Sequence, residues 1–213
     1  CRWKYRLYEK ERPLHDEQDL FSMSSKDLMA ARFIPDLIQA GIASLKIEGR
    51  MKSAYYIATL IKTYRLLIDE VYEKGNLSEE RLLWYYQELA KAENRPTAIG
   101  FYEGQPLPQA QLYGVNGAGV TQEFIAYVLA YDADTQIATL EVRNNFKPFI
   151  EAEVFGPHIT TTRFTFAELY DKDGKAMEVA KTPMQIITAK VPCVMEKDAM
   201  IRKVMKKDRS AIY

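Results

Sequence analysis

The spacing of hydrophobic residues differs between the two halves of the chain. In residues 1–93, apolar positions three and four apart predict helices, and short alternating runs predict strands between them. The alternating runs are Leu20–Ser25 and Ser44–Gly49, and the helical segments are Ile34–Ala40, Ile57–Val71 and a last helix that begins after Ser78. This order of strand, helix, strand, helix, helix is typical of an α/β fold.

Start and stop signals support these helices. Pro35 stands where the first helix begins, and Gly41 follows its last turn. Gly75 ends the second helix, and Ser78 is the expected N-cap of the third. The apolar residues expected to face the core are Ile57, Leu60, Ile61, Tyr64, Ile68 and Val71 in the second helix, and Leu82, Leu83, Tyr86 and Leu89 in the third.

After residues 94–97 the hydrophobic period changes to two. Alternating segments recur as far as Val191, and turn sequences such as Asp132–Thr135 and Asp171–Gly174 separate them. Several short strands without a long helix predict a small antiparallel barrel or sandwich. We therefore divide the chain into residues 1–93 and residues 94–213.

The first of these domains contains too few strands to close a barrel by itself. Two strand–helix units are about a quarter of those in a (β/α)₈ barrel. In addition, the chain begins with Cys1 rather than Met and runs directly into a dense segment. We expect a mixed α/β and α+β protein in which the last units of a (β/α) barrel precede an antiparallel β-barrel. The chain alone is expected to be inactive.

Composition excludes several classes of protein. Lys and Arg number 29, as do Asp and Glu, so no overall basic charge points to nucleic acid. No apolar run is long enough for a membrane span, and two cysteines cannot form a disulfide framework, so we expect a cytoplasmic protein without membrane contact. The two histidines, His15 and His158, leave little room for a His-based triad or an all-His metal site.

The segment Ser44–Gly49 carries the most informative polar residues. Its apolar residues would face the helices of a barrel, which leaves Lys46 and Glu48 directed inward. Arg50 follows at the carboxyl end of the strand, where βα barrels hold their active sites. Two interpretations remain open: Lys46 and Glu48 form an internal ion pair that fills the barrel, or they form a catalytic group with Arg50.

Polar residues also follow the first predicted strand. Ser25, Lys26 and Asp27 would lie at the same rim, where they are candidates to bind a phosphate or carboxylate together with Lys52. The alternative is that Ser25 or Asp27 only caps the next helix.

Cys1 and the basic tail are further candidates for binding, whereas Cys193 is not. A thiolate at Cys1, beside Arg2 and Lys4, would have a lowered pKa and suits a metal or cluster, although a cluster needs about four ligands. Cys193 lies in a strand-like run and is expected to be a buried thiol. The basic residues from Arg202 to Arg209 could contact RNA or form a solvated terminus.

Several sequence blocks resemble peptidase family U32, whose members are often called collagenase-like proteases. They are Ser25–Leu28, Ile34–Leu37, Ala40–Ile42 and Ser44–Tyr56 in the first domain, together with Cys1–Tyr5 at the start, and Asn94–Arg95, Gly100–Phe101, Val142–Phe146 and Pro183–Gln185 further on.

This resemblance implies a (β/α) barrel followed by a β-barrel. It also implies that the intact protein hydroxylates tRNA or rRNA, for example the wobble uridine of tRNA, with prephenate as a required metabolite. An iron–sulfur cluster would include Cys1 as one ligand, and no cofactor is expected in this chain alone. Met29 stands where the family often has a cysteine, which departs from its pattern.

Two other functions remain open. The intact protein could instead be a collagenase-like peptidase that acts on a protein or peptide. Alternatively, the β-domain could be a non-catalytic module that binds RNA or protein. Exposed strand edges at Phe21, Leu45 and Ile47 also predict self-association.

Overall fold

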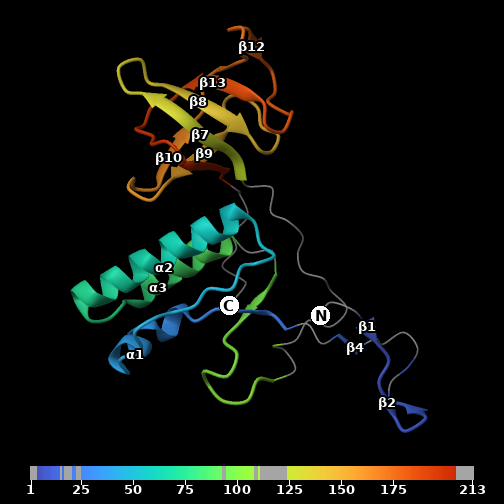
Figure 1. Cartoon of the computed structure of the whole chain (residues 1–213). Coiled ribbons are helices and arrows are strands. Elements are labelled where there is room, and N and C mark those ends of the chain that lie inside the picture. The colour runs from blue at the N-terminus through green and yellow to red at the C-terminus, as the bar shows by residue number, and fades with distance from the viewer. Residues whose placement is uncertain are drawn as a thin grey trace. The chain divides into compact units, whose positions relative to one another are not determined.

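In the computed structural model, the described residues are 4–14, 16, 21–22, 25–92, 95–107, 110 and 124–204. The chain divides into two units, Cys1–Val120 with Asp208–Tyr213, and Thr121–Lys207 (Figure 1). The first is mainly helical and the second consists of strands, so the predicted mixed α+β class is confirmed. None of the helices in the described segments is long and apolar enough to cross a membrane.

Three helices form the centre of the first unit: α1 (Ile34–Gln39), α2 (Ala54–Lys74) and α3 (Glu79–Ala90), with the short 3₁₀ turn η1 (Ala31–Phe33) before α1. Their ends follow the predicted signals. The Ser78 hydroxyl accepts a hydrogen bond from the Arg81 N–H at 3.2 Å, and the Ser53 hydroxyl caps α2 in the same way. Gly75 ends α2 with φ of 81°, in the left-handed region that favours glycine.

The predicted buried face of α2 is confirmed in part, because Val71 is buried and Leu60, Tyr64 and Ile68 pack, partly buried, against the same core. Leu67 and Val71 are buried in a cluster with Ile34 of α1 and with Tyr85 and Leu89 of α3. The other buried members of this cluster are Met29 and Ala31. By contrast, the predicted position Ile61 is 52% exposed. The apolar surface of α2 is therefore wider than one helix contact can bury, and part of it faces a pocket.

The strands of the first unit are short. β1 (Lys4–Tyr5) pairs with β4 (Phe21–Ser22), and β2 (Tyr8–Glu9) pairs with β3 (Arg12–Pro13), both antiparallel. β5 (Asp27–Leu28) pairs in parallel with β6 (Thr97–Ala98). Of the predicted strand Leu20–Ser25, the structure describes Phe21, Ser22 and Ser25, and of these Phe21 and Ser22 form strand β4.

The predicted strand Ser44–Gly49 is absent from the structure. These residues are described, and they form no ladder with another strand. Alternation alone does not make a strand, because a strand is stabilised by hydrogen bonds to a neighbour. The described residues offer no such neighbour here, since β5 pairs with β6 instead.

The second unit is a single eight-stranded antiparallel sheet that curls like half a barrel (Figure 1). Its strand order is β10-β9-β14-β7-β8-β13-β11-β12. The strands are β7 (Phe124–Asp132), β8 (Ile137–Val142), β9 (Glu151–Phe155), β10 (Thr162–Thr165), β11 (Leu169–Tyr170), β12 (Ala176–Met177), β13 (Ile186–Lys190) and β14 (Met200–Lys203). The antiparallel, barrel-like prediction is thus confirmed.

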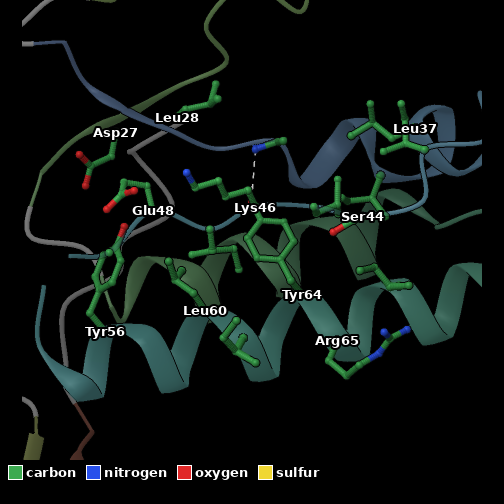
Figure 2. A pocket seen from close by; sticks show the side chains of 18 of the residues that line it. Asp27, Leu28, Leu37, Ser44, Lys46, Glu48, Tyr56, Leu60, Tyr64 and Arg65 are labelled. Atoms are coloured by element: carbon green, nitrogen blue, oxygen red, sulfur yellow. Dashed lines mark hydrogen bonds between the residues drawn. The ribbon is translucent and has the colours of Figure 1, made fainter.

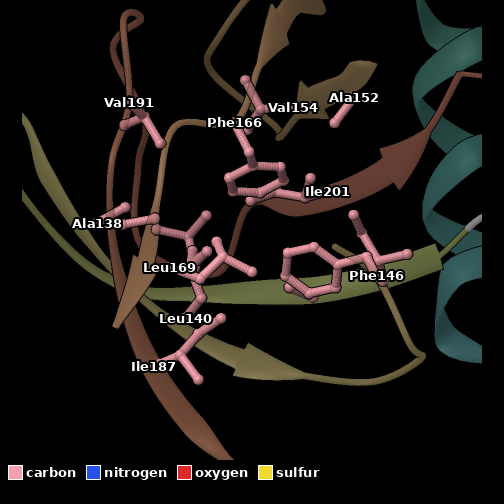
Figure 3. Packing of buried hydrophobic residues seen from close by; sticks show 14 of the residues in the cluster. Ala138, Leu140, Phe146, Ala152, Val154, Phe166, Leu169, Ile187, Val191 and Ile201 are labelled. Atoms are coloured by element: carbon pink, nitrogen blue, oxygen red, sulfur yellow. The ribbon is translucent and has the colours of Figure 1, made fainter. Parts of the chain in front are cut away.

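One continuous core fills the curl of this sheet. Figure 3 shows Leu140, Phe146, Phe166 and Ile201 converging from different strands and loops. Phe146 and Phe166 lie with their ring centroids 5.0 Å apart. The predicted hairpin at Asp132–Thr135 joins β7 and β8, and the Asp132 carboxylate accepts hydrogen bonds from two N–H groups of the turn.

The change of hydrophobic period at residues 94–97 does not coincide with the division into units. β6 follows it and pairs with β5 inside the first unit. The domain limits at residues 93 and 94 therefore remain a prediction.

Candidate functional site

A pocket of about 1050 Å³ lies in the first unit (Figure 2). Its walls are residues 25–28 with Ala30, one face of α1, the segment 42–52 and one face of α2. All the described residues proposed from the sequence as site residues line it, namely Ser25, Lys26, Asp27, Lys46, Glu48, Arg50 and Lys52. The structure brings together two chain segments that the sequence analysis connected only through barrel geometry. Their catalytic and binding roles remain predictions.

Asp27 and Lys52 form the firmest polar contact in the pocket. Lys52 Nζ donates to Asp27 Oδ2 at 2.6 Å, and these side chains are only 12% and 21% exposed for Lys52 and Asp27. Arg95 Nη1 lies 4.0 Å from Asp27 Oδ1, and Lys52 Nζ lies 4.6 Å from the centre of the Tyr56 ring. Asp27 itself lies in β5, and neither η1 nor α1 has a side-chain hydrogen bond at its N-cap, so the helix-cap alternative is wrong. The Asp27 carboxylate holds Lys52 at the pocket wall.

A tight turn joins segment 42–52 to α2. The Lys52 N–H donates to the Gly49 carbonyl at 2.8 Å, and the Arg50 N–H donates to Glu48 Oε1 at 2.9 Å. A Cβ atom on Gly49 would overlap Ile57 Cδ1, so this close approach favours glycine.

Lys46, Glu48 and Arg50 are exposed at the rim of the pocket. The prediction that Lys46 and Glu48 point into a closed barrel interior is therefore wrong for this structure, and so is the buried ion pair. The reason is the same as for the missing strand, because only neighbouring strands would enclose these side chains. Exposure leaves both charges hydrated and accessible to a ligand.

The floor of the pocket is apolar and comes from α2. Leu60, Ile61 and Ile68 line it together with Tyr64. The Tyr64 hydroxyl accepts a hydrogen bond from the Ala30 N–H at 3.2 Å, drawn dashed in Figure 2. Burial raises the pKa of Tyr64 to about 12, so the phenol is neutral at physiological pH. Leu60, Tyr64 and Ile68, which were predicted as core positions of α2, thus line the pocket and also pack against the helical core.

Positive charge exceeds negative charge along the pocket wall. Five Lys or Arg residues line it against two carboxylates. One cation, Arg65, is committed to Asp69 on the same helix, and Lys52 is paired with Asp27. Lys26, Lys46 and Arg50 are the other three. A pocket with an apolar floor and a cationic rim suits a ligand that has a ring or hydrocarbon part and an anionic group.

The proposed metal ligand Cys1 lies outside the described residues, as does His15. Within the described segments, no three His, Cys, Asp or Glu side chains are grouped so as to hold a metal ion. These segments therefore do not provide the ligand set of a cluster by themselves, and a cluster at Cys1 remains a prediction. Cys193 lies half-buried against the core of the second unit, where burial raises its pKa, as expected for a structural thiol.

Comparison with known sequences identifies the family. The sequence model of peptidase family U32 matches residues 1–112, and that of the peptidase family U32 C-terminal domain matches residues 120–202. The chain belongs to peptidase family U32. The resemblance found in the sequence blocks is confirmed.

Relatives in this family carry two kinds of name. The chain is 40% identical over 208 residues to tRNA hydroxylation protein P1 of Bacillus subtilis, a match that covers 95% of this chain and 49% of that protein. It is 29% identical over 200 residues to tRNA hydroxylation protein P of Escherichia coli, covering 90% and 43%. It is 31% identical over 146 residues to a collagenase of Porphyromonas gingivalis, covering 68% and 35%.

The chain thus spans about half the length of these curated relatives, or less. Among solved structures, it is similar to the C-terminal domain of a U32 peptidase of Geobacillus thermoleovorans. That match has 37% identity, a TM-score of 0.39, and covers 42% of this chain and 100% of the other.

Proposed function

We propose that the intact protein containing this chain takes part in the hydroxylation of a tRNA base, of the wobble-uridine type. One observation carries this proposal: the similarity to tRNA hydroxylation protein P1 extends over 95% of the chain, so that it includes both units. The match to the collagenase is lower in identity and covers 68% of the chain. A protein that takes part in tRNA hydroxylation would act in the cytoplasm.

The pocket supports this proposal through its charge. Lys46 and Arg50 are exposed cations at the rim, and they would hold an anionic group such as a phosphate of RNA or the carboxylate of a small metabolite like prephenate. Lys52 is held by Asp27 and supports the same wall. Of the described residues that line the pocket, none is a histidine or a cysteine, so a nucleophile with an imidazole base is not supported there.

The test uses a strain that lacks the intact protein. We expect mass spectrometry of tRNA nucleosides to show loss of the hydroxylated uridine, and the wild-type gene to restore it. Lys46→Ala and Arg50→Ala should restore it poorly, with a loss of about tenfold or more, because each removes a charge-assisted contact. Lys172→Ala, at an exposed turn of the second unit, is the matched control and should restore it fully.

A collagenase-like peptidase is the alternative that the same strain tests. Unchanged tRNA nucleosides, together with cleavage of denatured collagen by the purified intact protein, would contradict the hydroxylation proposal. Loss of the modified nucleoside without any such cleavage would contradict the peptidase.

A further inference from the structure

Two loops of the second unit lie side by side at one end of its sheet. Val142 and Pro183–Gln185, both parts of blocks that resemble the U32 family, are joined by backbone hydrogen bonds from the Met184 N–H to the Val142 carbonyl at 2.7 Å and from the Val142 N–H to the Gln185 carbonyl at 2.9 Å. Phe146 and Ala180 form a bridge beside them. We call residues 143–149 and 181–184 the loop surface.

The loop surface is fixed to the sheet from several sides. Asn144 Nδ2 donates to the Phe124 carbonyl of β7 at 2.7 Å, and Phe146 is buried in the core beside Phe166. The Phe149 N–H donates to the Phe166 carbonyl at 3.1 Å. The side chains that the loop surface presents are therefore held on a well-supported backbone.

Two apolar residues of the loop surface combine an unfavourable backbone conformation with exposure of the side chain to water. Phe149 has φ of 62° and Met184 has φ of 63°, a backbone conformation that favours glycine. Their side chains are also 70% and 66% exposed. Backbone strain and solvent exposure at the same bulky residue indicate that the side chain serves a contact beyond the fold.

The charge of this surface indicates which contact that is. Over residues 142–151 and 180–186 the sequence has three basic residues, Arg143, Lys147 and Lys181, and one acidic residue, Glu151. Arg143 is paired with Glu141, and its guanidinium lies 5.4 Å from the centre of the Tyr127 ring. Lys147 and Lys181 are exposed, and each directly follows one of the two bridged residues, Phe146 and Ala180. Exposed aromatic and cationic residues together suit a single-stranded nucleic acid.

We propose that the loop surface binds unpaired nucleotides of an RNA loop, with a base stacked on the Phe149 ring and phosphates held by Lys147 and Lys181. Stacking tolerates any base, whereas the lysines follow the backbone, so this contact would anchor the RNA without reading its sequence. The inference rests on the proposed function, because tRNA is the RNA concerned, and it adds where that RNA is held.

The experiment measures binding of a fluorescently labelled anticodon stem–loop RNA to the whole 213-residue chain by anisotropy at low salt. Phe149→Gly should weaken binding about tenfold, since it removes one stacking platform. The same change suits the left-handed backbone, so the thermal midpoint of unfolding should not fall. Phe149→Trp should keep the affinity.

The lysines have a separate readout. Lys147→Ala combined with Lys181→Ala should weaken binding and flatten its salt dependence, because each lysine that no longer neutralises a phosphate reduces the slope by about 0.7. The matched control combines Lys172→Ala with Lys197→Ala, which removes two exposed lysines elsewhere in the second unit and should leave affinity and slope unchanged.

Equal RNA affinity of Phe149→Gly and the wild type would overturn the inference. Phe149-dependent binding of denatured collagen with unaffected RNA binding would overturn it too and assign the surface to a protein. Nucleoside analysis separates the two proposals. If Phe149 governs RNA binding while the deletion strain keeps its hydroxylated uridine, only the proposed function fails. If that nucleoside disappears but Phe149 has no effect, only the loop surface fails.

Discussion

Among the described residues, each unit contains one buried glutamate held by cations, but the surroundings of the two glutamates differ. In the helical unit, Glu70 of α2 accepts hydrogen bonds from Arg81 of α3, from the Tyr85 hydroxyl and from Lys74. In the sheet unit, Glu153 of β9 lies opposite Arg202 of β14, and Arg202 Nη2 is 2.9 Å from Glu153 Oε2. Arg202 is 2% exposed, whereas the Arg81 and Lys74 side chains are 40% and 58% exposed.

The two ion pairs differ in whether water can solvate their charged groups once the pair is broken. When the contact between α2 and α3 opens, solvent reaches exposed Arg81 and Lys74 at once. In the sheet unit, the Arg202 guanidinium packs over the Phe155 ring. Removal of Arg202 or of Glu153 therefore leaves the charge of the other residue buried away from water. The sheet pair should therefore be the costlier one to break, although both use the same chemistry.

Arg202→Leu is the largest expected effect. We expect the second unit to lose about 3–5 kcal/mol of stability, since Glu153 would then depend on the more exposed cation Arg163. Combining Glu153→Leu with Arg202→Leu should recover most of this loss. Hydrogen exchange of peptides from residues 124–204 during urea titration measures both variants. If Arg81→Leu destabilises the helical unit equally, the comparison does not hold.

Glu70→Gln tests the helical pair through pH. Hydrogen bonds from Arg81, above all, lower the pKa of Glu70 from 4.5 to about 2 in the folded protein. A depressed pKa stabilises the fold above pH 4.5, and this contribution is lost as the pH falls toward 2. Glu70→Gln should lower stability at neutral pH by about 1.5–3 kcal/mol and make it less dependent on pH in that range.

Tryptophan fluorescence measures the change in stability of the first unit. Both tryptophans, Trp3 and Trp84, belong to the first unit. An unfolding midpoint that shifts with pH equally in Glu70→Gln and in the wild type would show that other groups cause the acid sensitivity.

Thr59→Val is the smallest expected effect, and it concerns the helical unit only. Thr59 Oγ1 is buried in α2 without a hydrogen-bond partner among the described residues, whereas Thr63 Oγ1 donates to the Thr59 carbonyl at 2.7 Å. Thr59→Val should therefore stabilise this unit by up to about 1 kcal/mol. Thr63→Val, the matched control one turn later, should not. Thermal unfolding followed by tryptophan fluorescence distinguishes them.

The two units also differ in how far their patterns predicted them. In the second unit, alternation between residues 124 and 191 predicted the antiparallel strands, because every strand finds its partner in the same sheet. In the first unit, the same kind of alternation at Ser44–Gly49 did not produce a strand. Helix ends were predicted best of all, since Ser78 and Gly75 act through hydrogen bonds and backbone angles within one turn.

The strand near the C-terminus does not follow from the local pattern. The sequence places Arg202 in a charged tail, but the residue lies in β14 between β9 and β7. No local signal announces this strand, because the partner of Arg202, Glu153, is 49 residues away. The basic composition of the segment pointed to solvent, whereas a buried carboxylate on another strand fixed its position.

The helices and their ends, the strand-rich second half, the family and the polar residues of the pocket could all be read from the amino-acid order. Folding determined which residues meet: Lys52 with Asp27, Glu70 with Arg81, and Phe149 with Phe166. The physical reason is the distance along the chain over which each interaction acts. Periodicity and capping depend on neighbours within a turn, but the burial of a charge and the enclosure of a pocket depend on chain segments that only folding brings together.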